Sequence, residues 1–110
     1  MSYRIHYYSE HVQADVLALP KTLLARYISL TDRMCVSGAN LGEPHTKAFG
    51  NGLFELRLKG AEGIARVFYC TQINRRIVIL HSFIKKTNKT PITAHRTALA
   101  RLKEIQHAHA

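Results

Sequence analysis

The sequence lacks the features that mark membrane, secreted and metal-dependent proteins. No apolar run approaches the roughly 20 residues that are needed to cross a bilayer. The N-terminus has no signal-peptide pattern of basic, apolar and small residues, so we expect a cytoplasmic protein. Acidic residues are scarce, seven in all, which is too few for a metal-dependent nuclease, and the histidines show no metal-binding pairing. The sequence therefore predicts no metal and no cofactor.

Cysteine is scarce too, and linkers and repeats are missing. Cys35 and Cys70 lie far apart, in no metal-ligand or redox spacing, so the sequence favours buried free thiols. No repeat, low-complexity segment or linker interrupts the 110 residues. We therefore expect one domain, residues 1–110, with a single core.

Positive charge is present in excess, but in one part of the chain. Residues 1–43 carry four basic and four acidic groups, whereas residues 44–103 carry twelve basic groups and two acidic ones. A basic face confined to part of a small domain is expected for a polyanionic partner, either nucleic acid or an acidic protein. The alternative is that the net charge of +9 serves solubility alone.

The apolar pattern predicts an α+β fold with the order β-α-α-β-β-β-α. A short strand over residues 3–8 precedes a helical hairpin over residues 9–37, which Pro20 divides and Gly38 ends. Residues 38–51 have a loop composition. Three antiparallel strands follow between residues 53 and 84, and Thr90-Pro91 starts the last helix. We expect both helical segments to pack on this small antiparallel sheet.

Alternation within the three consecutive strands predicts one apolar face and one basic face. We expect the apolar face to cover the helical hairpin, and the opposite face to display Arg57, Arg66 and His81 beside aromatic side chains. In the last strand, alternation separates Val78, Leu80, Ser82 and Ile84 from Ile77, Ile79, His81 and Phe83.

Three segments carry a resemblance to a known family: Gly-Leu-Phe-Glu-Leu-Arg over residues 52–57, Arg-Val-Phe-Tyr over residues 66–69, and Ile-Leu-His-Ser-Phe-Ile-Lys-Lys-Thr-Asn-Lys-Thr-Pro over residues 79–91. Together they resemble the phage-derived toxin branch of the RelE/HigB superfamily, and the match covers residues 44–103. The sequence departs from that pattern in two places. Ser82 stands where glycine is common, and Thr93, Ala94 and His95 stand where an acidic residue is frequent.

The resemblance implies the RelE-like fold and the toxin of a bacterial toxin–antitoxin pair. Most characterised relatives cut messenger RNA, usually at the ribosome, and a protein antitoxin neutralises them. A related ParE-like branch shares the fold but poisons DNA gyrase. We therefore expect a metal-free mRNA interferase with a cognate antitoxin, for which a helix-turn-helix protein is the expected type. A ParE-like gyrase inhibitor and a non-enzymatic RNA- or protein-binding domain remain the alternatives.

Arg57 and Arg66 are the first candidates for catalysis. Metal-free RNA cleavage needs a base, an acid and cations that stabilise the developing charge. Two arginines on neighbouring strands can clamp a phosphate, and the resemblance places the family's arginines on these two strands. Alternation alone does not show that they share a face. In the alternative interpretation they form salt bridges with Glu55 or Glu62.

Lysines before the last helix are the second set of candidates. Cations at a helix N-terminus are unfavourable unless an anion lies between them and the helix, which suggests a docked phosphate. From the residues alone a solvated loop is an equal alternative, and it is the resemblance that favours the phosphate. A desolvated lysine among other cations can also act as a base. The loop 38–51 brings a further lysine to the edge of the sheet. The residues are Lys85 and Lys86 as catalytic candidates, with Lys89 and Lys47 as RNA-binding candidates.

His81 and Phe83 complete the predicted site. A lone histidine at the end of an apolar strand is either a packed rim residue or an acid or base, and His81 stays a catalytic candidate. Phe83 or Tyr69 can stack on a splayed base, although both residue types are also common in cores. The sequence does not single out the general base.

Overall fold

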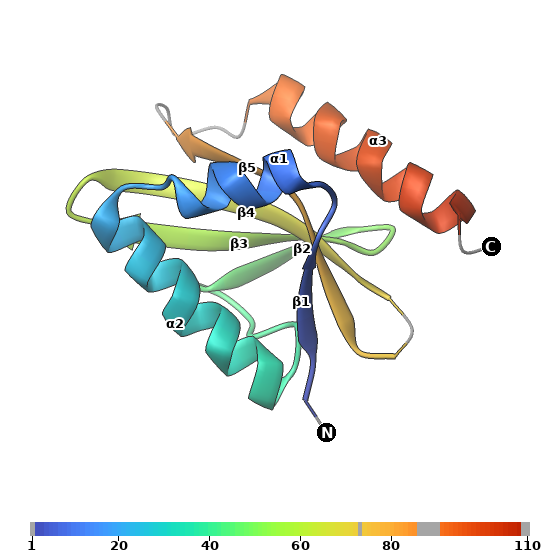
Figure 1. Ribbon diagram of the computed structural model, residues 1–110, viewed down its shortest axis with the longest axis horizontal. Coiled ribbons are helices and arrows are strands. Elements are labelled where there is room, and N and C mark those ends of the chain that lie inside the picture. Colours follow the sequence, from blue (N-terminus) through green and yellow to red (C-terminus); the bar gives the residue numbers. More distant parts are fainter. Residues whose placement is uncertain (1, 73, 86–90, 109–110) are drawn as a thin grey trace.

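The computed structural model describes residues 2–72, 74–85 and 91–108, and over these residues one five-stranded sheet lies between helices (Figure 1). The strands lie in the order β1-β5-β4-β3-β2. In chain order the elements are β1 (Arg4–Tyr7), α1 (Glu10–Leu17), α2 (Lys21–Ser37), β2 (Thr46–Gly50), β3 (Leu53–Gly60), β4 (Gly63–Gln72), β5 (Arg76–Lys85) and α3 (Ile92–Ala108).

The predicted α+β fold is confirmed, with two differences in the sheet. The segment expected to be a loop contains β2, which pairs antiparallel with β3. Its composition hid it, because Lys47, Ala48 and Phe49 are all exposed and give no buried alternation. The sheet is also mixed rather than wholly antiparallel, since β1 pairs with β5 in parallel, from Arg4 beside Arg76 onwards.

The helical hairpin begins and ends at the residues that the sequence indicates. The Ser9 hydroxyl accepts a hydrogen bond from the Val12 N–H at 3.1 Å and caps α1. Pro20 is the N-cap of α2 and Gly38, with φ of 114°, is its C-cap. The Glu62 carboxylate accepts from the Thr22 N–H at 3.2 Å, which places a negative charge at the α2 N-terminus.

The helices cover opposite faces of the sheet, so the molecule has three layers (Figure 1). On one face α1 and α2 bury a large core against β3, β4 and β5. On the other face, Ala98 and Leu102 of α3 pack on Phe68 and Leu80. Helix α3 therefore covers the centre of the face that was expected to display Arg57, Arg66 and His81. No helix among the described residues is long and apolar enough to span a membrane.

Both cysteines carry free thiols, as expected. Cys70 is buried beneath α3, and burial raises its pKa to about 11. Cys35, near the end of α2, is half-buried.

A β-bulge in β5 changes the predicted alternation. Phe68 of β4 pairs with His81 and the next residue, Tyr69, pairs with Ile79, so Leu80 is an extra residue in β5. Beyond the bulge the side chains change face. The prediction that His81 and Phe83 share a face with Ile77 and Ile79 is therefore wrong: the register places them on the face that carries Phe68 and α3.

Candidate functional site

Arg57 and Arg66 lie directly opposite each other on β3 and β4. Residues paired in this way project their side chains from the same face of a sheet. The question that alternation leaves open is thereby answered: the two arginines share the α3 side. The Arg57 side chain is 27% exposed and the Arg66 side chain is 10% exposed. A partly exposed cation therefore lies beside a mostly buried one.

A buried carboxylate holds both arginines. Oε1 of Glu55 lies 3.4 Å from Nε of Arg57 and 3.5 Å from Nε of Arg66, and the Glu55 side chain is 2% exposed. The exposed Glu43 adds a hydrogen bond from Nη1 of Arg57 at 3.3 Å. The salt-bridge interpretation is therefore confirmed for Glu55 and not for Glu62, whose carboxylate binds α2 instead.

The contact with Glu55 does not satisfy all of the Arg66 guanidinium. Nε of Arg66 is buried without a hydrogen-bond partner, although Glu55 is within ion-pair distance and Nη1 donates to the Ala65 carbonyl at 3.3 Å. Burial lowers the pKa of Arg66, Glu55 opposes that effect and Arg57 adds to it. Arginine nevertheless stays charged. An anion that reached this pair would relieve the repulsion between the two guanidinium groups.

The sheet arranges the other predicted residues in rows across its strands. Arg57, Arg66 and Phe83 form one row over β3, β4 and β5. One row lies on each side of it. The first contains Lys47, Glu55, Phe68 and His81, and the second contains Lys59, Ile64 and Lys85. Six predicted site residues, Lys47, Arg57, Arg66, His81, Phe83 and Lys85, therefore share one face. Lys86 and Lys89 lie outside the described residues.

Aromatic rings gather beside the arginine pair. Phe68 is buried at their centre, 6.0 Å from Phe83 and 5.8 Å from Phe49 between ring centroids. The His95 ring of α3 lies 5.5 Å from Phe49, and Nζ of Lys47 lies 5.5 Å from the Phe49 centroid. The site predicted from the sequence missed Phe49 and His95. Phe49 was hidden in the unrecognised strand β2, and His95 stood out only as a departure from the family pattern.

A hollow opens beside the start of β2, where no described strand covers the edge of β3 beyond Leu56. Its volume is ≈ 320 Å³, at the lower end of the range for small-molecule sites, roughly 300–1,000 Å³. Four of its lining side chains are arginine or lysine, so the hollow suits an anionic group. The lining residues are Arg26, Pro44, His45, Arg57, Lys59 and Arg66. Arg26 of α2 could not be placed here from sequence, because it comes from the layer on the other side of the sheet.

His81 and Lys85 have pKa values shifted towards the neutral form. Burial, and then the nearby Arg101, lower the pKa of His81, while Asp15 opposes them. The His81 ring stacks on Phe83 with 6.1 Å between centroids. Desolvation lowers the pKa of Lys85, and Arg66 is the next cause. Both shifts favour the neutral form, in which the nitrogen carries a free lone pair.

The described residues contain no group of three or more histidine, cysteine, aspartate or glutamate side chains that could hold a metal ion. The candidate site consists of cations, one buried carboxylate, the partly buried imidazoles of His45, His81 and His95, and aromatic rings. Such a set can bind a phosphodiester, stabilise added negative charge and accept a proton.

Comparisons with known proteins agree with this fold. The family model described as Phage derived protein Gp49-like (DUF891) matches residues 14–103. A chain of the structure described as the crystal structure of an archaeal RelE-RelB complex from Pyrococcus horikoshii OT3 superimposes with a TM-score of 0.56 and 21% sequence identity. That similarity covers 78% of this chain and 98% of the archaeal chain. No curated protein matches the sequence.

Proposed function

Because this chain belongs to the Gp49-like family of phage-derived proteins, we propose that it is a toxin that cuts messenger RNA without a metal. The resemblance to the phage-derived branch of the RelE/HigB superfamily is confirmed by that family, and the RelE-like fold by the archaeal structure. RelE-like proteins are components of toxin–antitoxin pairs. The nuclease activity and its target are the part that we add.

The arginine pair is the observation that carries the proposal. Arg57 and Arg66 stand in register on one face, braced by the buried Glu55, with the Phe83 ring as the next residue in the row. A phosphate against the two guanidinium groups would place an adjacent base near Phe83. Bases of single-stranded RNA are commonly held by stacking on aromatic side chains.

The proposed reaction is a transesterification at phosphorus. The RNA 2′-oxygen loses its proton to a base and attacks the adjacent phosphorus, the bond to the 5′-oxygen breaks, and an acid protonates that oxygen. The products are a 2′,3′-cyclic phosphate and a 5′-hydroxyl. Arg57 and Arg66 stabilise the extra negative charge on the pentacoordinate phosphate. His81 and Lys85 are the described residues whose lowered pKa values suit proton transfer.

The proposed partners follow from the same site. Messenger RNA is the substrate, most accessibly at the ribosome, where it is single-stranded. The archaeal RelE structure is a complex with RelB, and by analogy we propose that a cognate antitoxin, of the helix-turn-helix type, covers the basic face. An acidic antitoxin would be steered to that face and would associate faster at low salt.

Cleavage assays with a matched variant test the proposal. Purified protein is incubated with messenger RNA, with and without ribosomes, and the new RNA ends are mapped. Arg66→Ala should abolish cleavage and relieve growth arrest, whereas Arg33→Ala, which removes one exposed arginine from α2, should leave both intact. Intact RNA together with blocked DNA supercoiling would replace the proposal with gyrase inhibition. If the protein neither cuts RNA nor blocks supercoiling, it is a non-enzymatic binding domain.

A further inference from the structure

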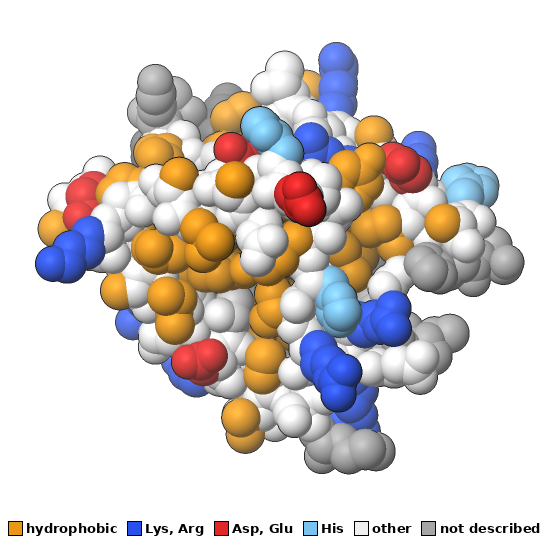
Figure 2. Space-filling view, in the orientation of Figure 1, with side chains coloured by type: hydrophobic (Ala, Val, Ile, Leu, Met, Phe, Trp, Pro, Cys, Tyr) orange, Lys and Arg blue, Asp and Glu red, His pale blue; other side chains and the backbone are white. Residues whose placement is uncertain are grey.

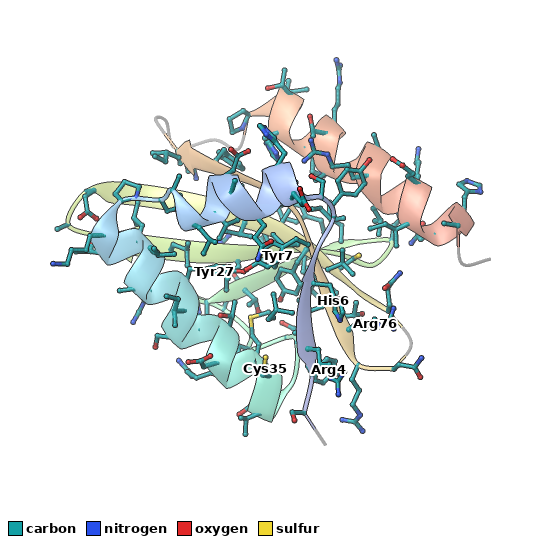
Figure 3. The ribbon with its side chains drawn as sticks, viewed as in Figure 1. Arg4, His6, Tyr7, Tyr27, Cys35 and Arg76 are labelled. Atoms are coloured by element: carbon teal, nitrogen blue, oxygen red, sulfur yellow. The ribbon has the colours of Figure 1, made fainter. Side chains whose placement is uncertain are left out.

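A second group of basic residues lies at the opposite end of β5 from Phe83. Arg4 of β1 and Arg76 of β5 are register partners on parallel strands, and His6 follows two residues later on the same side of β1. Figure 3 shows Arg4, His6 and Arg76 together at this end of the sheet, and blue and pale-blue side chains gather there in Figure 2. We call Arg4, Arg75 and Arg76 the arginine corner.

The arginine corner is concave. A hollow of ≈ 510 Å³ is lined by Ser2, Arg4, Asn74, Arg75 and Arg76. A neighbouring hollow of ≈ 460 Å³ shares Asn74 and Arg76 and extends to Gln106 of α3. The two hollows therefore adjoin at Asn74 and Arg76, one on the side of β1 and the other on the side of α3. Guanidinium and amide groups line the part nearest β1.

The backbone holds this corner in place. Asn74 and Arg75 have φ values of 72° and 58°, in the left-handed region that arginine seldom adopts. The Arg75 carbonyl accepts a hydrogen bond from the Arg4 N–H at 2.9 Å, so the turn before β5 is tied to β1. The Arg75 guanidinium lies 5.7 Å over the Tyr3 ring. The positions of the arginines are thus fixed by the turn and by β1 together.

The arginine corner differs from the candidate catalytic site in its ion pairing. Within the described ranges, neither Arg4 nor Arg76 forms an ion pair with a carboxylate, whereas Arg57 and Arg66 share Glu55. Both Arg4 and Arg76 are exposed. Arg4 and Arg76 therefore contribute a positive potential to this concave surface, and such a potential attracts a polyanion.

The chemistry of the lining favours backbone phosphates over bases. The side chains of the hollow beside β1 are guanidinium, hydroxyl and amide groups, with no aromatic ring among them, and Arg75 covers the ring of Tyr3. The catalytic face, by contrast, carries Phe49 and Phe83. Single strands are held by stacking, whereas duplex RNA is recognised by its shape and through its phosphates and 2′-hydroxyls.

We propose that the arginine corner binds the phosphate backbone of double-helical RNA. Arg76 pairs with Gln72 and Phe83 pairs with Arg66, six residues apart on β4, so the corner lies about 20 Å from the stacking ring at roughly 3.3 Å per residue. Both lie on the α3 side of the sheet. A folded RNA held at the corner can therefore present a single-stranded segment to the arginine pair. This inference rests on the proposed function, because it assumes that RNA is the substrate.

Binding titrations with a matched pair of variants test the corner. The probe is a fluorescent RNA duplex of about 16 base pairs, methylated at its 2′-oxygens so that it is not cut. Arg4→Gln/Arg76→Gln should weaken duplex binding roughly ten- to a hundredfold and reduce the log–log salt slope by about 1.8, for two contacts at the duplex value. The control, Lys21→Gln/Arg33→Gln, removes the same charge from exposed positions of α2 and should change affinity far less.

Three results would overturn the inference. Duplex binding could be equal in the wild type and the corner variant. Both double variants could weaken it alike, which would leave net charge as the cause. Polyglutamate, added at the same concentration of charge as the duplex, could displace the duplex from the wild type but not from the corner variant. That result would assign the corner to an acidic protein. Because binding is measured without cleavage, a protein that binds the duplex through Arg4 and Arg76 but cuts no RNA would refute the proposed function alone.

Discussion

The Glu55 carboxylate lies 3.5 Å from Nε of Arg66, and both side chains are withdrawn from solvent. A buried cation beside a second cation would be costly without this anion. Glu55 therefore stabilises the two arginines from their buried side. Arg57 also lines the hollow at the edge of β3. The carboxylate compensates part of the positive charge of the two arginines.

Replacing Glu55 tests this relationship. Glu55→Gln keeps the shape of the side chain and removes its charge, so we expect a loss of roughly 3–5 kcal/mol in the free energy of unfolding, as for other broken buried pairs. Urea denaturation measures the loss. The control Glu43→Gln, at a side chain that is 69% exposed, should cost about 0–1 kcal/mol.

Anion rescue provides a second measurement on the same variant. Phosphate added to Glu55→Gln should restore more stability than it adds to the wild type, because the uncompensated arginines would bind it. Equal losses in the glutamine variants of Glu55 and Glu43, with no difference in phosphate response, would show that Glu55 does not compensate the arginine pair.

Arg66→Lys separates charge from geometry. Lysine keeps the positive charge but cannot present two parallel N–H groups to a phosphate. If Arg66 acts on the transition state, the single-turnover cleavage rate should fall about 10²–10³-fold with little change in RNA affinity, as when one oxyanion donor is lost. Arg33→Lys on α2 is the matched control. An unchanged rate in Arg66→Lys would leave Arg66 with a purely electrostatic role.

Much of this arrangement could be predicted from the sequence, because strand alternation is a local property. Alternation correctly separated Arg57 from Leu56 and Leu58 on β3, and Arg66 from Val67 on β4. It failed at Leu80, where an extra residue reverses the side of everything that follows. A bulge depends on the pairing of two strands, which a single run of residues does not specify.

Residues brought together by long-range packing could not be predicted. His95 of α3 meets Phe49 because both rings pack against Phe68, and Phe49 comes from β2, a strand without buried alternation. Arg4 meets Arg76 because β1 adds to the sheet beside β5 rather than beside its neighbour in sequence. Both contacts depend on topology, whereas composition indicated only that positive charge would gather somewhere in residues 44–103.

The lowered pKa of His81 predicts a pH-dependent stability. Burial disfavours the charged imidazole, so the unfolded chain, with a histidine pKa of about 6.5, binds more protons than the folded one. Stability that is present above this value should be lost as the pH falls through the folded pKa. His81→Gln should flatten the part of the stability profile that lies below about pH 6.5. His107→Gln, at an exposed position of α3, should leave the profile as in the wild type.

RNA binding at the catalytic face should depend on salt in proportion to the phosphates that it contacts. If Arg57, Arg66, Lys85, Lys86 and Lys89 contact five phosphates, a short single strand should give a log–log salt slope of about −3.5. Raising the salt from roughly 50 to 200 mM would weaken binding by about two decades. Fluorescence titrations with a 2′-O-methylated strand of roughly six nucleotides measure this slope without cleavage.

Two variants distinguish the phosphate contacts, which set the salt slope, from base stacking, which does not. Lys86→Ala should reduce the slope by about 0.7, for one lost contact, and weaken all sequences alike. Phe83→Leu keeps the apolar packing against Phe68 but removes the ring, so it should cost roughly 1–3 kcal/mol of affinity and leave the slope unchanged. A wild-type slope near zero would instead assign the basic face to a protein partner. Because the arginine corner contributes to duplex binding and not to a strand this short, Arg4→Gln/Arg76→Gln provides the internal comparison.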